Sequence, residues 1–386
     1  MLNDCAQEPL PFPALQHSAA ETALLPIDGR SGRRDARRQA SVRELRNRYR
    51  QSCLHTAAES STRSSRAARL IGTTEGELVA AHCGVFAPGE SPMKSRRLQA
   101  QWPEIVRAMA DLGEVACTVG HDDCALTRIG PCTTDSSPDL RYDLWCHGFA
   151  VEERQADGRR ARSLQFFGRD GRLIIKFALT ARSLPCVYFD LVEDFGTHEL
   201  SAGIVIEGTG AAHVWPQCTD TAPLRQAWAS LRRADAVAAL FKRLGVSELQ
   251  ALQGLASEYA SPLPVESAQE LLARAAQAGL AVTARAGVGG AHLCWTGELK
   301  RIHVVGAQVT ASAPGILLNW HEDRLACAWL VKTPTSVGLG HSLVLFDGEG
   351  RFVLRIEGQR HPGRPESCQW RELLFSLSEE RTPCRC

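Results

Sequence analysis

A pattern of fifteen residues occurs twice in this chain and constrains the fold more than any other feature. Residues 163–177 read SLQFFGRDGRLIIKF and residues 342–356 read SLVLFDGEGRFVLRI, and the offset from Ser163 to Ser342 holds through both copies without a gap. In each copy, apolar and β-branched residues flank a Gly/Asp-rich tetrad whose glycines can adopt positive φ angles. Each copy is therefore predicted to form two β-strands joined by a tight turn.

The sequence after each hairpin is also repeated. Apolar residues spaced as i, i+3, i+4 and i+7 follow both copies: Tyr188, Leu191, Val192 and Phe195 after the first, and Trp370, Leu373, Leu374 and Leu377 after the second. This spacing predicts a helix whose apolar stripe lies on a sheet. We interpret the chain as two copies of one antiparallel sheet-plus-helix unit, because a period this long indicates a duplicated domain and not a solenoid.

The repeat predicts the domain boundaries. We expect a tail over residues 1–40, an N-terminal repeat over 41–210, a linker over 211–223, a C-terminal repeat over 224–380 and a second tail over 381–386. The first tail is expected to be disordered, because it has too little apolar surface to offset the entropy of ordering it. Its arginine cluster, residues 30–38, is interpreted as solvated surface rather than a nucleic-acid or phospholipid arm, because no aromatic residues are interleaved.

The charge balance argues against several classes of partner. Lys and Arg number 44 against 43 Asp and Glu, a net charge of +1, so no global field draws the chain to nucleic acid or to an anionic membrane. No run approaches the roughly 18 to 20 apolar residues that span a bilayer. The N-terminus also lacks the basic and apolar regions of a signal peptide. We therefore expect a cytoplasmic protein that is not inserted in a membrane and does not bind nucleic acid.

The fourteen cysteines are expected to be reduced, because no export signal accompanies them. Cys117, Cys186, Cys294 and Cys327 lie in apolar runs and are predicted to pack as small hydrophobic residues. The terminal Cys384-Arg385-Cys386 has a spacing too short for half of a zinc site, and no CxxC occurs.

Each repeat is also predicted to contain two short helices separated by a glycine. The first pair turns at Gly72 and resumes at Thr74, and the second turns at Gly245 and resumes at Ser247, each with the form of a capping box. Such pairs occur in DNA-reading proteins. Here the second helix opens with acidic residues, so packing against the sheet is the better interpretation. The helix that ends at Gly245 is predicted to begin at about residue 223.

No hydrolytic triad order, nucleophile elbow, Walker loop or dinucleotide fingerprint occurs, and no histidine spacing indicates a metal cage. The glycine-rich residues 287–290 lie between strand-like segments and are predicted to form a hairpin turn instead of a phosphate loop. His147 and His321 are single histidines near thiol or carboxylate groups, for which a surface or hydrogen-bonded role is the simplest interpretation.

Several spaced motifs resemble the HemS/ChuS/PhuS family of cytoplasmic haem-handling proteins, also called hemin-degrading factors. In the C-terminal half they are residues 332–338 (KTPTSVG), 342–347 (SLVLFD), 358–360 (GQR), 363–366 (GRPE) and 370–371 (WR). The N-terminal half is similar through residues 139–141 and 163–167, and residues 224–228 resemble the opening of the helix between the family's halves. The resemblance covers about residues 64–380 and implies an α+β fold of two tandem repeats, each a large antiparallel β-sheet with flanking helices.

The resemblance also implies a function. Family members receive haem after uptake and either carry it to an oxygenase or degrade it themselves. A porphyrin requires an apolar slot, cationic partners for its propionates and a His, Tyr, Cys or Met side chain for iron. Arg141 matches the arginine on the N-domain side of the haem, and Arg360 matches one contributed by the C-terminal domain. A structural ion pair is the alternative role for each guanidinium.

The chain departs from the family at its ligand positions. Counting from Trp228 places Asp235 where the family has its ligand histidine, and aspartate is a poor haem-iron ligand. A second family histidine corresponds to Asn319. His321 lies two residues beyond Asn319, and strand alternation keeps both on one face, so His321 is the predicted substitute ligand.

Three further positions differ together with these two. Glu357 replaces a family tyrosine, Glu248 replaces a basic residue, and Thr333 replaces a lysine, with Lys332 one place earlier. Lys332 is therefore a further predicted haem contact. Together the five changes indicate an altered ligand pocket.

Three hypotheses for the function remain open at this point. The leading one is a haem carrier that acts with a haem oxygenase or a haem importer. The second is an enzyme that cleaves haem with an external electron donor, for which no proton donor can be named. The third is a scaffold that has lost haem and serves as an interaction or regulatory protein.

Overall fold

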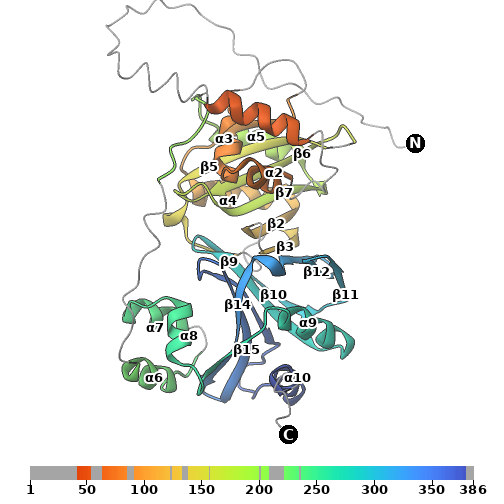
Figure 1. Cartoon of the computed structure of the whole chain (residues 1–386). Helices are drawn as coiled ribbons and strands as arrows, with labels where there is room; N and C mark the ends of the chain where they lie inside the picture. The colour runs from red at the N-terminus through yellow and green to blue at the C-terminus, as the bar shows by residue number, and fades with distance from the viewer. Residues whose placement is uncertain are drawn as a thin grey trace, which may run out of the picture.

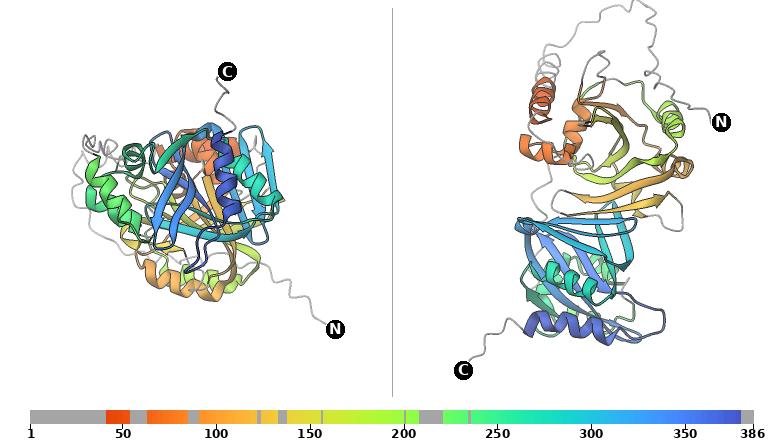
Figure 2. Two further views of the ribbon diagram at one scale, coloured as in Figure 1. Left: turned by 90° about the horizontal axis from the view of Figure 1, so that it is seen from below. Right: turned by 90° about the vertical axis from the view of Figure 1, so that its right-hand side faces the viewer.

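The computed structural model describes residues 41–53, 63–84, 91–121, 124–132, 138–155, 157–199, 201–207, 221–233 and 236–379. The expected tails, most of the predicted linker and Asp235 lie outside these ranges. The described chain forms two large antiparallel sheets, one above the other, with helices against their faces (Figures 1 and 2). This arrangement confirms the predicted α+β fold.

The first sheet has nine strands in the order β1-β5-β6-β7-β2-β3-β13-β12-β11. Their bounds are Met93–Arg97, His147–Arg154, Arg160–Phe167, Leu173–Ser183, Gly113–His121, Cys124–Pro131, Ile316–His321, Gln308–Ala313 and Arg301–Val305. The second sheet has seven strands in the order β4-β10-β9-β16-β15-β14-β8. Their bounds are Asp139–Leu140, Ala291–Glu298, Ala281–Val288, Phe352–Gly358, Gly338–Asp347, Leu325–Thr335 and Ala260–Leu263.

The two halves of the chain exchange strands. The short strand β4, from the N-terminal half, pairs with β10 of the seven-stranded sheet. Strands β11, β12 and β13, from the C-terminal half, extend the nine-stranded sheet by pairing with β3. Each sheet is therefore completed by the other half, so the repeat boundary in the sequence is not a boundary between the sheets.

Both predicted hairpins are present as β6–β7 and β15–β16. Their turns use Gly171 and Gly350 at φ angles of 70° and 73°, which side chains with a Cβ rarely adopt. The helices predicted after them are also present, as α5 (Pro185–Phe195) and α10 (Cys368–Glu379). The hairpin turn predicted at residues 287–290 is present between β9 and β10, with residues 287–288 still paired in β9 and residues 289–290 forming the turn.

The short helices lie where the repeat places them. Helices α2 (Arg63–Ile71) and α3 (Glu75–Ala81) correspond to α7 (Val237–Leu244) and α8 (Glu248–Gly254), and both capping boxes are formed. The prediction of one helix from about residue 223 to 244 is wrong, because α6 (Ala222–Ala229) ends before α7 begins. The remaining helices are residues 41–53, α4 (Trp102–Ala108), η2 (Met109–Leu112), η4 (Tyr142–Leu144), α9 (Ser267–Gln277) and η6 (Glu322–Arg324).

Three apolar cores hold these elements together. The largest joins one face of each sheet to α4, α5, α9 and α10. A second lies under α6, α7 and α8 on the other face of the seven-stranded sheet, and a third lies under residues 41–53, α2 and α3 on the nine-stranded sheet. Trp228 in α6 and Tyr49 are fully buried in these two smaller cores. They are separated by the same offset as Ser163 and Ser342, so helix 41–53 is the N-terminal counterpart of α6.

The cysteines in the described chain are free thiols. Cys117 is buried as predicted and Cys327 is half-buried, but Cys186 and Cys294 are exposed, so the prediction is wrong for these two. Cys294 lies on the outward face of β10, where alternation turns it away from the core reached by Leu293. Within the described ranges, no helix is both long and apolar enough to cross a membrane.

Candidate functional site

The N-terminal half places Arg141 against the seven-stranded sheet. Arg141 follows β4, and its backbone N–H donates to the carbonyl of Gly290 at the β9–β10 turn, over 3.0 Å. Its guanidinium donates two hydrogen bonds to Asp143, at 3.0 and 3.1 Å, and these bonds lower the pKa of that carboxyl. Lys242 of α7 lowers it further, so the β4–η4 loop lies within electrostatic range of α7.

One face of the seven-stranded sheet carries a set of polar residues near Arg141. Leu354 and Ile356 of β16, Ala284 and Ala286 of β9 and Leu293 of β10 point into the largest core. By alternation, their neighbours point to the opposite face. We call this set the polar face; it comprises Asp139, His292, Cys294, Thr296, Thr283, Arg285, Arg355 and Glu357.

The strand register orders the polar face from the β9–β10 turn toward the far end of β9. His292 of β10 lies directly opposite Asp139 of β4. Cys294, Arg285 and Arg355 form the next row across three strands, and Thr296, Thr283 and Glu357 form the row after that. Charged and ligating groups therefore follow one another along the strands.

Helix α8 bounds the polar face on one side. Glu248, the first residue of α8, forms an ion pair with Arg355, and both side chains are largely buried. The charge of Glu248 also acts on His292, together with those of Asp139, Arg285 and Arg141. Burial is the main cause that lowers the pKa of His292. Glu248, which stands where the family has a basic residue, is therefore paired with Arg355.

Arg360 lies at the far end of the polar face. Its Nη2 atom is 2.9 Å from Oε2 of Glu357, and a Cβ at Gly340 would overlap its guanidinium group. The Nε atom of Arg360 is buried and has no hydrogen-bond partner within the described ranges. Arg141 and Arg360 therefore lie on the same face of one sheet, toward opposite ends of its strands.

Lys332, by contrast, lies on the opposite face. It pairs with His341 in the β14–β15 ladder, and its Nζ atom is 5.7 Å from the ring centroid of Phe375 in α10. Its neighbour Val331 belongs to the core under α6–α8, so alternation turns Lys332 away from Arg360. Thr333 points to the same side as Arg360. The structure therefore does not bring Lys332 together with the predicted arginines.

The predicted substitute ligand, His321, lies in the other sheet. It ends β13, and its Nδ1 atom is 4.0 Å from Oδ1 of Asp323. Asn319 shares its face and accepts a hydrogen bond from Thr310. The reason for the separation is the strand exchange, because β13 is the counterpart of β4 in the repeat and joins the other sheet. His321 and Arg141 hold corresponding positions in the two repeats. They therefore occupy similar places, but in different sheets.

The nine-stranded sheet does not repeat the polar face. In the β2–β3 hairpin Gly120 pairs with Ala125, and in the β9–β10 hairpin Gly287 pairs with His292. The nine-stranded sheet therefore has an alanine at the position that His292 occupies in the seven-stranded sheet. Lys176, the counterpart of Arg355, is buried 3.7 Å from the Glu153 carboxylate, which also accepts a hydrogen bond from Tyr49. The aligned histidine and arginine side chains are therefore a feature of the C-terminal sheet.

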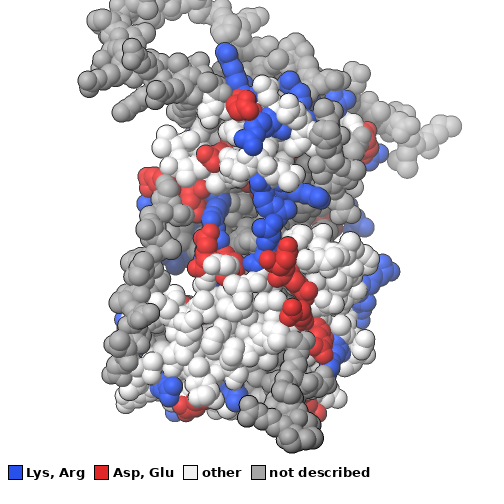
Figure 3. All heavy atoms as spheres, viewed as in Figure 1, with Lys and Arg blue, Asp and Glu red and all other residues white. Residues whose placement is uncertain are grey.

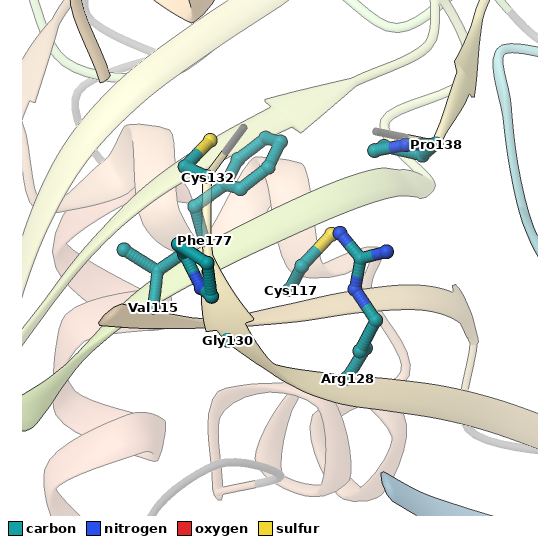
Figure 4. A pocket seen from close by; sticks show the side chains of 8 residues that line it. Val115, Cys117, Arg128, Gly130, Cys132, Pro138 and Phe177 are labelled. Atoms are coloured by element: carbon teal, nitrogen blue, oxygen red, sulfur yellow. The ribbon is translucent and has the colours of Figure 1, made fainter. Parts of the chain in front are cut away.

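Charged side chains gather where the two halves meet (Figure 3). Figure 3 shows the surface hollowed between the two halves, just above β9 in this view, with Lys, Arg, Asp and Glu side chains around the hollow. A separate small cavity of about 10 Å³ lies in the nine-stranded sheet between Cys117, Arg128 and Phe177 (Figure 4). It is large enough for about one water molecule, so it is not a cofactor site.

Two family models match separate parts of the chain. Residues 245–377 match the model described as the haemin-degrading HemS.ChuX domain. Residues 96–185 match the model described as haem utilisation ChuX/HutX. Each half of the tandem repeat therefore has its own match.

Three relatives match most of the chain. The hemin transport protein HmuS of Yersinia pestis is 24% identical over 324 residues, which are 80% of this chain and 91% of that protein. The hemin transport protein HemS of Yersinia enterocolitica is 26% identical over 245 residues, 63% of this chain and 70% of that protein. The crystal structure of holo-PhuS, a heme-binding protein from Pseudomonas aeruginosa, is 27% identical with a TM-score of 0.75 and covers 87% of this chain and 98% of its own.

Proposed function

We propose that this chain, which belongs to the HemS/ChuS/PhuS family of haem-utilisation proteins, binds haem at the polar face and carries it in the cytoplasm. The observation that carries the proposal is the placement of Arg141. Through β4, the N-terminal half adds an arginine to a face of the C-terminal sheet that already holds Arg285, Arg355 and Arg360.

The charges of this face suit a dianionic tetrapyrrole. Arginine binds carboxylates through two parallel hydrogen bonds, which is the recognition that haem propionates require. Asp143 and Glu357 hold Arg141 and Arg360 in place in the free protein. The unpartnered Nε of Arg360 leaves a buried donor that a ligand carboxylate would satisfy.

A carrier role fits the site better than catalysis does. Oxidative cleavage of haem needs a positioned proton donor near the iron-bound oxygen. The arginines on which the proposal rests bind carboxylates and do not give up protons. We therefore assign to this chain the reception of haem and its transfer to a haem oxygenase.

Titration of the full chain with hemin tests the proposal. We expect a saturable, shifted Soret band with one hemin per chain, because the polar face occurs in one sheet. Arg141→Ala and Arg360→Ala should each weaken binding about tenfold through loss of a charge-assisted hydrogen bond. Arg159→Ala is the matched control, since Arg159 is 87% exposed and pairs only with Asp157 among the salt bridges of the described chain.

Two results would contradict the proposal. Hemin that absorbs as it does in buffer alone would show that the scaffold no longer binds haem. Hemin that is bound but destroyed on incubation with ascorbate and oxygen would show an enzyme instead of a carrier. A carrier should release intact hemin to apomyoglobin.

A further inference from the structure

We infer that His292 is the axial ligand of haem iron in this chain. The inference rests on the proposed function and names the ligand at that same site. In the family the ligand histidine occupies the position of Asp235 in this sequence. Here a histidine on a strand of the sheet takes that role.

The strand register places a glycine opposite His292. Its direct partner on β9 is Gly287, at a φ angle of 146°, where a Cβ would overlap the backbone of Ala291 and His292. The imidazole therefore has no side chain opposite it on the β9 side.

On its other side His292 faces Asp139 of β4. Side chains directly opposite in an antiparallel pair have Cβ atoms about 5 Å apart. Histidines that bind metals usually donate their second ring N–H to a carboxylate or carbonyl, which fixes the tautomer and the ring orientation. Asp139 is placed to take this role, with His292 presenting its other nitrogen.

The surrounding charges favour the form of the ring that binds iron. Burial lowers the pKa of His292, Arg285 and Arg141 lower it further, and Asp139 and Glu248 oppose them. The imidazole is therefore neutral at pH 7, and only a neutral imidazole has a free lone pair for a metal. The same two arginines lie on either side of it, where propionates require cations.

Other histidines of the described chain do not meet these conditions. His82 and His341 are buried and bound to the carbonyl of Leu78 and to Glu366, respectively. His121, His147, His303 and His321 belong to strands of the nine-stranded sheet, and His198 follows α5. Among the residues that define the polar face, His292 is the histidine; the exposed His361 follows Arg360 beyond the end of β16. Cys294, two residues further along the same face, is the rival ligand.

Hemin spectra of the full chain and four variants test the assignment. The variants are His292→Ala, Cys294→Ser, His321→Ala and Asp139→Asn, each checked by its thermal melting temperature. In the wild type we expect the spectrum of histidine-ligated ferric haem. His292→Ala should lose the shifted Soret band, and added free imidazole should restore it, which would not happen if His292 served only to stabilise the fold. Asp139→Asn should keep the ligand and weaken binding about tenfold.

The outcomes separate the inference from the function on which it rests. If the wild type and His292→Ala give the same shifted band, or if Cys294→Ser or His321→Ala alone abolishes it, the ligand assignment is overturned while haem binding stands. If the wild type itself does not bind hemin, the proposed function fails and the inference fails with it.

Discussion

Asp139 of the N-terminal half and His292 of the C-terminal half are direct partners in an antiparallel strand pair. The reciprocal exchange pairs Asn319 of β13 with Ala125 of β3. Each half therefore leaves an unpaired strand edge when it is alone, and exposed edges associate with other chains. The exchange makes the two sheets depend on each other although the sequence divides into repeats.

Cutting the chain after residue 207 tests this dependence. We expect fragments 1–207 and 208–386 to aggregate or oligomerise when expressed separately, and to form a 1:1 complex when they are refolded together. Analytical ultracentrifugation and circular dichroism of the separate and mixed fragments provide the measurement. Two monomeric fragments that each unfold cooperatively would show that the strand exchange is not needed for either sheet.

Gly340 controls the position of Arg360. A methyl group at Gly340 would overlap the guanidinium, which sits at the end of a flexible side chain and can move away. We expect Gly340→Ala to change the free energy of unfolding by less than about 1 kcal/mol and to weaken hemin binding about as much as Arg360→Ala does. Gly130→Ala is the control, because no atom lies within 4 Å of a Cβ at that position. Unchanged hemin affinity in Gly340→Ala would show that Arg360 can bind its ligand from another position.

The pair formed by His341 and Glu366 ties β15 to the segment before α10. Glu366 accepts from the His341 backbone N–H at 2.7 Å and lies 2.6 Å from Nδ1, and the two side chains are 4% and 5% exposed. Glu366→Ala leaves both donors unpaired in the interior, so we expect a loss of about 3 kcal/mol in the free energy of unfolding. Glu366→Gln keeps an acceptor and should lose less.

Urea unfolding at pH 7 measures both losses. Glu349→Ala is the control, since Glu349 is 55% exposed and its ion pairs with Arg172 and Arg351 lie at the surface. A Glu366→Ala variant as stable as this control would mean that water satisfies the freed donors.

Local patterns were enough to predict the hairpins, because the turn glycines and the flanking apolar residues act within a few positions of one another. The helices α5 and α10 followed from the same kind of signal. The break between α6 and α7 was missed, since apolar residues continue through it. The partners of β4 and β13 could not be predicted, because periodicity defines the faces of a strand and not the sheet that it joins.

The same limit applies to the site. The family resemblance named Arg141 and Arg360, which the structure places on one face. His321 was chosen by alternation along its own strand, and the alternation is correct, yet β13 belongs to the other sheet. His292 and Arg285 carried the same alternating signal within residues 281–298. Only the pairing of β4 with β10 shows that their face is the one that Arg141 reaches.

His82 makes the stability of the N-terminal half depend on pH. The imidazole is buried, its Nδ1–H donates to the carbonyl of Leu78 at 2.8 Å, and burial lowers its pKa to about 4. Between about pH 6.5 and pH 4 the unfolded chain binds a proton at this position and the folded chain does not. Acid therefore favours unfolding in this window, and His82 should remove about 2 kcal/mol of stability between pH 7 and pH 5.

The substitution His82→Asn tests this dependence, because the amide N–H can replace Nδ1–H as donor to Leu78 without titrating. We expect the variant to lose less stability than the wild type between pH 7 and pH 5, by about 2 kcal/mol, in urea unfolding at both pH values. His303→Asn, at an exposed position on β11, should instead follow the wild type. Removing a buried imidazole that titrates only in the unfolded chain must reduce the proton uptake on unfolding. If His82→Asn and the wild type nevertheless lose the same stability between pH 7 and pH 5, the acid sensitivity of the fold arises from other groups.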